Sequence, residues 1–368
     1  MNQNEKKMLI YPFTAETIPY INYISHFRLN WLVNDITSFI GSGLIGKDVG
    51  VADNRFTVGS IVKEYSENLL SRNDLIIIFH ADNNQIQEHA LAIMMQAFHH
   101  KKDVICIMKL EEDTLEDMLN LAKENNVKFE YLVDVDAIHT VKHVSKAMYT
   151  PSVPVAFVGG LIDCANQNEV TLAIAGQLKE QGISVSVLGY DDEYSLLGQH
   201  SYKYVFNNNS LEHEKIREFN QLVKAVAEIE KPDIILVQLN GTMLRFNDIL
   251  TNDFGVYAYM FSQAILPDYF VCCSMYGMYD ADSFIKISEY FQNRFLFKID
   301  CVHISNAMLD IAQSIEMGAL QYINVSPIKV DEYLDEQKMS ETIPIYNILK
   351  KENLKSMIDN MLRKLICE

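Results

Sequence analysis

The organisation of the chain is clearest over one stretch that reads Val155-Ala156-Phe157-Val158-Gly159-Gly160-Leu161-Ile162-Asp163-Cys164-Ala165-Asn166-Gln167. Its first four residues form a continuous apolar run, which is typical of a strand buried on both faces. A glycine-rich turn follows, and residues 168–181 show the apolar spacing of a helix. The stretch therefore predicts a strand, a phosphate-type loop and a helix in direct succession.

Strands and helices alternate on both sides of this unit. Upstream, strands are predicted at 8–13, 29–33, 75–79, 104–108 and 129–133, with helices at 84–99 and 113–125. Downstream, strands are predicted at 183–188, 233–237, 269–273, 299–303 and 320–325, with helices at 211–230, 255–265, 281–293, 305–317 and 345–366. This alternation predicts βαβ units and parallel sheets.

Two prolines close to residue 150, Pro151 and Pro154, suggest a domain boundary because they stop a helix and leave the chain extended. We predict an α/β protein of two domains. Residues 1–150 form an N-terminal Rossmann-like parallel sheet, and residues 151–330 form a C-terminal degenerate P-loop NTPase-like parallel sheet. Residues 331–368 form a C-terminal helical tail, which we expect to pack on the body of the protein or on a second copy.

The charge of the chain excludes some classes of partner. The formal net charge is −18, which repels phosphate backbones and argues against general nucleic-acid binding. No apolar stretch approaches the roughly 20 residues that cross a bilayer, so no membrane partner is expected. Six cysteines without a Cys-x-x-Cys pair, and no secretory signal at the start, predict a cytoplasmic protein with reduced thiols.

The loop after the strand at 155–158 lacks the residues that hold a polyphosphate. The usual phosphate loop ends in Gly-Lys-Ser/Thr, and its lysine neutralises the phosphates. Counted from Gly160, the last three positions of the loop are Ala165, Asn166 and Gln167. Counted back from the start of the helix, Gln167 and Asn168 stand in place of Gly-Lys. All of these residues are neutral. Asp163 adds a negative charge within the loop, which weakens polyphosphate binding further. Two interpretations stay open: a small-molecule site with altered chemistry, or a remnant that binds nothing.

A second element, Val237-Gln238-Leu239-Asn240-Gly241-Thr242, follows the strand predicted at 233–237. Phosphate-loop enzymes place an acid at such a position to order magnesium, and this chain has neutral amides there. After the strand at 183–188 come Asp191 and Asp192, which form either part of a site at the same sheet edge or a solvated loop. The predicted ligand-binding residues are Gly159, Gly160, Asp163, Asn166, Gln167, Asn168, Asp191, Asn240, Gly241 and Thr242. No catalytic residue and no metal site is predicted.

Two other patterns have weaker support. Residues 41–46 match Gly-x-Gly-x-x-Gly, but a dinucleotide site needs a strand before the motif and a helix after it. Residues 47–54 have no helical periodicity and contain a further glycine, so we predict a loop. His139 and His143 would share a helix face, yet a zinc site needs more ligands, and we interpret them as surface histidines.

These elements together resemble a known two-domain pattern, in which a Rossmann-like domain precedes a phosphate-loop domain related to dethiobiotin synthetase. The pattern includes the D-glutamate N-acetyltransferase-like proteins, whose loop carries Asp-Cys followed closely by Gly-Lys and whose later strand ends in Glu-Gly. Here Asp163-Cys164 is kept, Gly-Lys becomes Gln167-Asn168, and the Glu position falls near Gln238 or Leu239. Within that group the chain resembles the clostridial-type peptide maturation system proteins of ribosomal peptide natural product clusters.

This resemblance implies an accessory role in peptide modification, with a precursor peptide or a radical-type modifying enzyme as partner. The leading hypothesis is therefore a protein that binds one of these without ATP hydrolysis. An acyltransferase or ligase acting on an amino acid or peptide amine is the alternative, with Asp163, Asp191, Asp192 and Asn240 converging. A small-molecule sensor that uses the inter-domain cleft is a third. No cofactor is predicted, while a nucleotide, acyl-coenzyme A and a homo-oligomer are left open.

Overall fold

The computed structural model describes residues 5–50, 59–81, 83–134, 147–162, 165–245, 247–248, 251, 253–337 and 343–367. The chain divides into two compact units. The N-terminal unit comprises Met1–Val135 together with Asp192–Gly198, and the C-terminal unit comprises Asp136–Asp191 and Gln199–Glu368. Each unit contains a parallel sheet of its own, as the α/β pattern of the sequence predicted.

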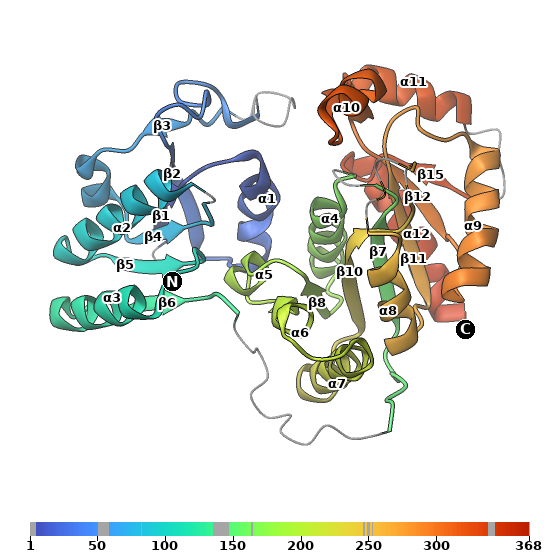
Figure 1. The fold of residues 1–368 in the computed structure, drawn as a ribbon, viewed down its shortest axis with the longest axis horizontal. Coiled ribbons are helices and arrows are strands. Elements are labelled where there is room, and N and C mark those ends of the chain that lie inside the picture. Colours follow the sequence, from blue (N-terminus) through green and yellow to red (C-terminus); the bar gives the residue numbers. More distant parts are fainter. Residues whose placement is uncertain are drawn as a thin grey trace. The chain divides into compact units, whose positions relative to one another are not determined.

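The N-terminal unit is built on a six-stranded sheet (Figure 1). Its elements are β1 (Lys6–Tyr11), η1 (Ala15–Thr17), α1 (Ile18–Phe27), β2 (Trp31–Ser38), β3 (Lys63–Glu64), η3 (Glu67–Arg72), β4 (Leu75–Ile78), α2 (Asn84–His99), β5 (Asp103–Cys106), α3 (Glu112–Asn125), β6 (Phe129–Tyr131) and α5 (Glu193–Leu196). The strand order is β3-β2-β1-β4-β5-β6, and every pair is parallel. This is the doubly wound order of Rossmann-type sheets.

The Gly-x-Gly-x-x-Gly motif at 41–46 follows β2 rather than β1. A dinucleotide fingerprint belongs in the turn between the first strand and the first helix. In this unit that turn carries Pro12 and Thr14 and has no glycine. Residues 41–47 form turns and bends, Asp48 makes an isolated bridge with Ile61, and Val49 and Gly50 have 3-10 helical geometry. No α-helix follows the motif within the described residues, and residues 51–54 of the predicted loop lie outside them.

The C-terminal unit contains a seven-stranded sheet in the order β15-β12-β11-β7-β10-β8-β9, with every pair parallel. Its elements are β7 (Val155–Gly160), α4 (Gln167–Glu180), β8 (Val185–Gly189), β9 (His200–Ser201), α6 (Lys203–Asn207), α7 (Glu212–Glu230), β10 (Ile234–Thr242), α8 (Val256–Ala264), β11 (Tyr269–Ser274), α9 (Ala281–Phe295), β12 (Cys301–Ile304), β13 (Ala307–Leu309), α10 (Ile311–Met317), β14 (Tyr322–Asn324), α11 (Pro327–Gln337), β15 (Ile345–Tyr346) and α12 (Lys351–Cys367).

Helices cover both faces of this sheet. Val155 and Phe157 point into a core with side chains of α7, α8 and α9, such as Phe219 and Phe261. The alternate residue Ala156 is also buried but belongs to the opposite face, because side chains alternate along a strand. On that face α4 packs against β7, β8 and β10, and α12 packs against α4 and β11. Figure 1 shows α4 on one side of the sheet and α8 and α9 on the other.

The last part of the chain differs from the prediction. Residues 305–317 contain the short strand β13 before α10, instead of one helix. The predicted strand at 320–325 is β14, which pairs antiparallel with β13 rather than joining the parallel sheet. Short apolar runs indicate a strand but do not specify its partner, which explains the difference. The tail also supplies β15 to the edge of the parallel sheet, and α12 packs on the body of its own unit.

Within the described part of the chain, no helix combines the length and the apolar character that crossing a membrane requires.

Candidate functional site

The predicted site residues of the C-terminal unit lie where its parallel strands end. At this point α4 leaves β7 on one face, whereas the neighbours β10 and β11 continue into α8 and α9 on the other. Ligands of open α/β sheets bind where adjacent connections diverge in this way, at the carboxyl ends of the strands. The end of β7 is therefore the position at which a ligand site is expected.

The main chain after β7 is engaged in the sheet rather than curled into an open cradle. Leu161 N–H donates to the carbonyl oxygen of Cys273 at 2.9 Å, and Met243 N–H donates to the carbonyl oxygen of Gly160 at 3.0 Å. The side chains of Leu161, Ile162 and Ala165 are buried. Strand pairing thus extends to Leu161, the first residue after β7.

The start of α4 packs a side chain against the glycine-rich turn and buries an acid. A Cβ atom at Gly160 would lie 2.9 Å from Oε1 of Gln167, so this amide lies directly against the glycine. Glu169, in the first turn of α4, is only 1% exposed. The N-terminus of a helix stabilises a negative charge, and here it already has a buried carboxylate of the chain itself. The missing lysine is therefore accompanied by an added acid.

Asn168 and Asp191, both predicted site residues, are in direct contact. Asn168 Nδ2 donates to Asp191 Oδ2 at 2.6 Å, which joins the first turn of α4 to the end of β8. Asp163 lies outside the described residues, so its place in the site stays a prediction. Asp192, which the enzyme hypothesis added, is the first residue of the segment that joins the N-terminal unit, and its Oδ1 accepts a hydrogen bond from Asp134 N–H at 3.1 Å.

Strand β10 does not end at residue 237 but runs to Thr242. Gln238 pairs with Val158 and Thr242 with Gly160, so β10 has two more residues than β7 between these pairs. Such a bulge breaks the ladder locally and is common beside functional sites. Gly241 makes the bulge feasible, because its φ of 71° is disfavoured for residues with a Cβ atom.

Gln238, which stands near the expected acid, is a structural amide. Its side chain is 3% exposed. Oε1 accepts a hydrogen bond from Tyr190 N–H at 3.0 Å, and Nε2 donates to the carbonyl oxygen of Leu239 at 2.6 Å. These bonds tie the end of β8 to β10 and engage both ends of the amide.

The sequence reasoning missed one acid at this edge. Asp253 Oδ2 accepts a hydrogen bond from Thr242 N–H at 3.0 Å and would lie 2.6 Å from a Cβ atom at Gly241. Tyr257, on α8, contacts the same glycine position. Asp253 comes eleven residues after Thr242, beyond a connection without a periodic pattern, so no local signal pointed to it. The edge near Asn240 is therefore not purely amide in character.

The structure thus brings most of the predicted residues to one sheet edge. Gly160 pairs with Thr242 and contacts Gln167, while Asn168 binds Asp191. Gly159 packs inward, where a Cβ atom would lie 2.9 Å from Sδ of Met243. Asn166 caps α4 with a left-handed backbone, φ 62°. Whether these residues bind a ligand stays a prediction.

The pKa values of the buried cysteine thiols argue against a role of these thiols as nucleophiles. Cys106 and Cys301 are buried, and burial raises the pKa of each thiol to about 12. Burial also raises the pKa of Cys272 and Cys273 well above the ordinary value. A thiol in this state contains almost no thiolate at neutral pH. Among the described residues, no group of three or more His, Cys, Asp or Glu side chains could hold a metal ion.

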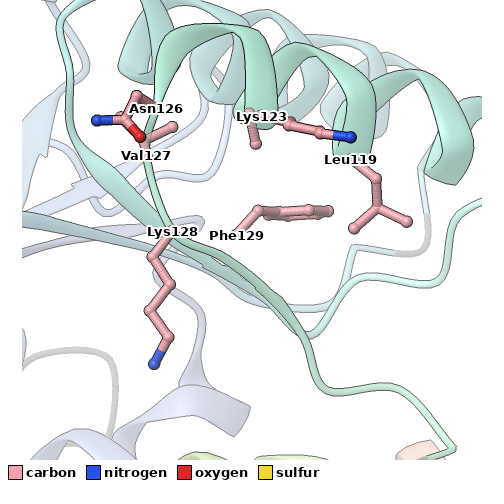
Figure 2. A pocket seen from close by; sticks show the side chains of 7 residues that line it. Leu119, Lys123, Asn126, Val127, Lys128 and Phe129 are labelled. Atoms are coloured by element: carbon pink, nitrogen blue, oxygen red, sulfur yellow. The ribbon is translucent and has the colours of Figure 1, made fainter.

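A hollow in the N-terminal unit lies at the other end of its strands. It has a volume of about 510 Å³ and lies between the end of α3 and the start of β6 (Figure 2). Phe129 and Leu119 line it together with Lys123 and Lys128. Lysines at the C-terminus of a helix favour the helix dipole, which accounts for them without a ligand. The hollow faces the amino end of β6, whereas ligands of such sheets bind at carboxyl ends.

A serine, a histidine and a carboxylate meet beside β8, but not in catalytic order. Ser186 Oγ donates to Glu230 Oε2 at 2.5 Å, and His200 Nε2 lies 2.7 Å from Glu230 Oε1. A catalytic serine must contact the histidine that takes its proton. Here the carboxylate stands between them, so the cluster is a structural tie between β8, β9 and α7.

This tie predicts a pH dependence of stability. The hydrogen bond from His200 holds the pKa of Glu230 below its ordinary value, although burial opposes it. A lowered pKa stabilises the fold above the unfolded value of 4.5, and this contribution is lost as the pH falls through the folded value. The side chain is 39% exposed, so solvent screening leaves about 0.5 kcal/mol. We expect Glu230→Gln to lower the urea midpoint at pH 7, and the gap to the original protein to shrink as the pH falls below 4.5. A gap that does not change with pH would contradict this.

Comparison with known proteins yields a fold but no family. No family model matches the sequence, and no curated protein matches it. A DUF1611 family protein from Anabaena variabilis is similar over 97% of this chain and 99% of that chain, with a TM-score of 0.59 and 10% identity. At this identity the likeness shows a shared two-unit α/β, Rossmann-like fold and nothing of the activity.

Two further solved structures match shorter stretches. A homoserine dehydrogenase from Staphylococcus aureus has a TM-score of 0.28 and 16% identity, over 36% of this chain and 34% of that chain. The WlbA dehydrogenase from Bordetella pertussis, in complex with NADH and UDP-GlcNAcA, has a TM-score of 0.28 and 12% identity, over 52% of this chain and 44% of that chain. Similarity at this level carries no functional argument.

Proposed function

We propose that this protein is an accessory protein of a peptide natural product maturation system, which binds the precursor peptide or its modifying enzyme without hydrolysing ATP. The observation that carries the proposal is the closed phosphate position, where Gln167 lies against Gly160 and the carboxylate of Glu169 is buried at the start of α4. The maturation system itself comes from the resemblance around Asp163-Cys164 and residues 239–242.

Electrostatics support the loss of nucleotide hydrolysis. A nucleoside triphosphate at the end of β7 would meet Glu169 and Asp191 where phosphate-loop enzymes provide a lysine. Like charges within a few ångströms repel strongly in a partly buried site. Asp253 adds a third carboxylate at the same edge, next to Thr242. Acids and amides in this arrangement suit an amine or a peptide group better than a phosphate.

Nucleotide binding gives a direct test. We expect no rise in the melting temperature with millimolar magnesium-ATP or with coenzyme A. A ligand present at a hundred times its dissociation constant stabilises the folded state by about 2.7 kcal/mol, which a thermal scan detects readily. The variant Glu169→Gln removes the negative charge of the added acid at the start of α4 and serves as the control for its effect on nucleotide binding. A clear stabilisation of the original protein by ATP would contradict the proposal.

The partner requires a separate measurement. We expect the purified protein to capture either a precursor peptide or a radical-type modifying enzyme of such a maturation system, under reducing conditions and without nucleotide. Addition of ATP should leave the captured amount unchanged, because the proposed binding does not depend on hydrolysis. Capture of neither partner would refute the accessory role.

An acyltransferase or ligase acting on a peptide amine is the second candidate. Asp253 favours it, because a carboxylate beside Gly241 and Thr242 could accept a proton from an attacking amine. Turnover of an acyl-coenzyme A or of ATP with amine acceptors, abolished by Asp253→Asn, would support this candidate. Turnover that survives Asp253→Asn would exclude the assigned role of this residue.

A further inference from the structure

Two side chains near the start of α8 meet over the bulge of β10. A Cβ atom at Gly241 would lie 2.6 Å from Asp253 Oδ2 and 2.8 Å from Cδ2 of Tyr257. Both side chains lie against the same backbone position, so the carboxylate and the aromatic ring are next to each other. Helix α8, which carries Tyr257, packs against β10 (Figure 1). We refer to these two side chains as the Asp253–Tyr257 pair.

One oxygen of Asp253 is used by the chain and the other is not. Oδ2 accepts a hydrogen bond from Thr242 N–H at 3.0 Å, and Asp253 N–H donates to Thr242 Oγ1 at 3.3 Å. Within the described part of the chain, no group donates a hydrogen bond to Oδ1. Asp253 and Tyr257 are both partly exposed. The carboxylate is therefore fixed at the bulge by one oxygen and open to a ligand through the other.

Asp253 also has no cationic partner among the described residues. The cations of neighbouring segments are engaged elsewhere. Arg245 Nη1 lies 3.1 Å from Asp248 Oδ1. Arg294 donates a hydrogen bond to the carbonyl oxygen of Phe254. A positive charge within a few ångströms stabilises a partly buried carboxylate, and here a ligand has to supply it.

The ring of Tyr257 is held in place by packing. It contacts the core of its unit, and its centroid lies 5.8 Å from that of Phe206. Burial raises the pKa of Tyr190, Lys203 lowers it and Tyr257 raises it further, so these groups lie within electrostatic reach of one another. A cation beside an aromatic ring gains cation–π attraction, most strongly where water is excluded. The ring therefore adds to the attraction that the carboxylate of Asp253 exerts on a cation.

The geometry of the pair discriminates between kinds of cation. A guanidinium group pairs best with both oxygens of a carboxylate, but Thr242 N–H already engages Oδ2 of Asp253. A magnesium ion needs several oxygen ligands, and no cluster of three His, Cys, Asp or Glu side chains exists among the described residues to supply them. An ammonium group is a compact donor, for which one carboxylate oxygen and one ring suffice.

We infer that the Asp253–Tyr257 pair is a binding site for a primary ammonium group, such as that of a lysine side chain or of a peptide amino terminus. The inference rests on the proposed function, because there the bound peptide or enzyme carries this group. Oδ1 of Asp253 accepts a hydrogen bond from the ammonium, and the ring of Tyr257 lies beside it. The carboxyl edge of the sheet thus binds a positive group where phosphate-loop proteins bind a negative one.

The test uses three labelled peptides that differ in their amines. The first has a blocked amino terminus and one lysine, the second has acetyl-lysine in its place, and the third has a free amino terminus and no lysine. Fluorescence anisotropy is measured with the full chain and with Asp253→Asn, Tyr257→Leu and Asp248→Asn. Asp248 is the matched control, because its carboxylate lies on the same connection and its side chain is 89% exposed.

Melting temperatures show whether the variants fold. The amide oxygen of Asp253→Asn can still accept a hydrogen bond from Thr242 N–H, so this variant removes the charge and keeps the bond that fixes the bulge.

We expect at least one of the two amine peptides to bind, and the acetyl-lysine peptide to bind at least about tenfold more weakly than it. Asp253→Asn should weaken binding about tenfold and Tyr257→Leu about threefold, whereas Asp248→Asn should leave it unchanged. The amine peptide whose binding depends on Asp253 identifies the source of the ammonium group. Equal binding of all three peptides, no binding of either amine peptide, or binding that Asp253→Asn leaves intact would overturn the inference.

The outcome is distinguishable from a failure of the proposed function. If the protein captures a precursor peptide or modifying enzyme and Asp253→Asn captures it equally well, the function stands and the ammonium site is wrong. If an amine peptide binds through Asp253 but neither partner is captured, the ammonium site stands and the accessory role fails.

Discussion

Replacing Lys63 and Arg72 together with methionine should lower the free energy of unfolding of the N-terminal unit by about 3–5 kcal/mol. Asp35, on β2, is almost fully buried, and its carboxylate lies 2.5 Å from Lys63 Nζ and 3.1 Å from Arg72 Nε. Asn73 Nδ2 adds a hydrogen bond at 2.8 Å. Removal of both cations leaves the buried carboxylate with amide donors alone, and a buried charge without a cationic partner is costly.

The measurement can be confined to this unit. Trp31 is the single tryptophan of the chain and lies on β2, so its fluorescence during urea unfolding reports on the N-terminal sheet. Lys6→Met is the control, because Lys6 pairs with the partly exposed Asp103 and such pairs contribute about 1 kcal/mol or less. Adding Asp35→Asn to the double variant should recover part of the loss. A double variant no less stable than Lys6→Met would refute the assignment.

The regular βα alternation was predictable because it is encoded locally. Buried parallel strands appear as continuous apolar runs, and the helix predicted at 84–99 has the observed bounds of α2. The strand at 155–158 and the following helix were likewise found at β7 and α4. Ligands of open α/β sheets bind at the carboxyl ends of the strands. This rule predicted the sheet edge at which Gly160, Asn168, Asp191 and Thr242 lie.

Features that depend on distant partners were not predictable. Asp253 reaches Thr242 across a connection with no periodic pattern, and the bulge at Gly241 depends on its register with β7. Residues 192–198 follow β8 along the chain yet belong to the compact N-terminal unit. Gln167 has the helix-start position that the sequence assigned, but only the packing shows that its amide fills the space beside Gly160.

Gly241→Ala should lower the free energy of unfolding of the C-terminal unit by about 3 kcal/mol, from two separable costs. Its backbone φ of 71° is left-handed, which costs a residue with a Cβ atom about 1–2 kcal/mol. The new Cβ atom would also lie 2.6 Å from Asp253 Oδ2, so the carboxylate must move away from Thr242 N–H. The loss of the acceptor of that buried donor costs about another 1–3 kcal/mol.

Gly277→Ala separates the two costs. Gly277 has a φ of 66° in the same unit, but a Cβ atom there would meet nothing within 4 Å. This variant should therefore lose only the backbone contribution, about 1–2 kcal/mol, in urea unfolding followed by circular dichroism. The difference between the two glycines measures the contact between Asp253 and the bulge of β10. Equal losses would mean that Asp253 does not hold Thr242, and the acid would then have no structural role in shaping the candidate site.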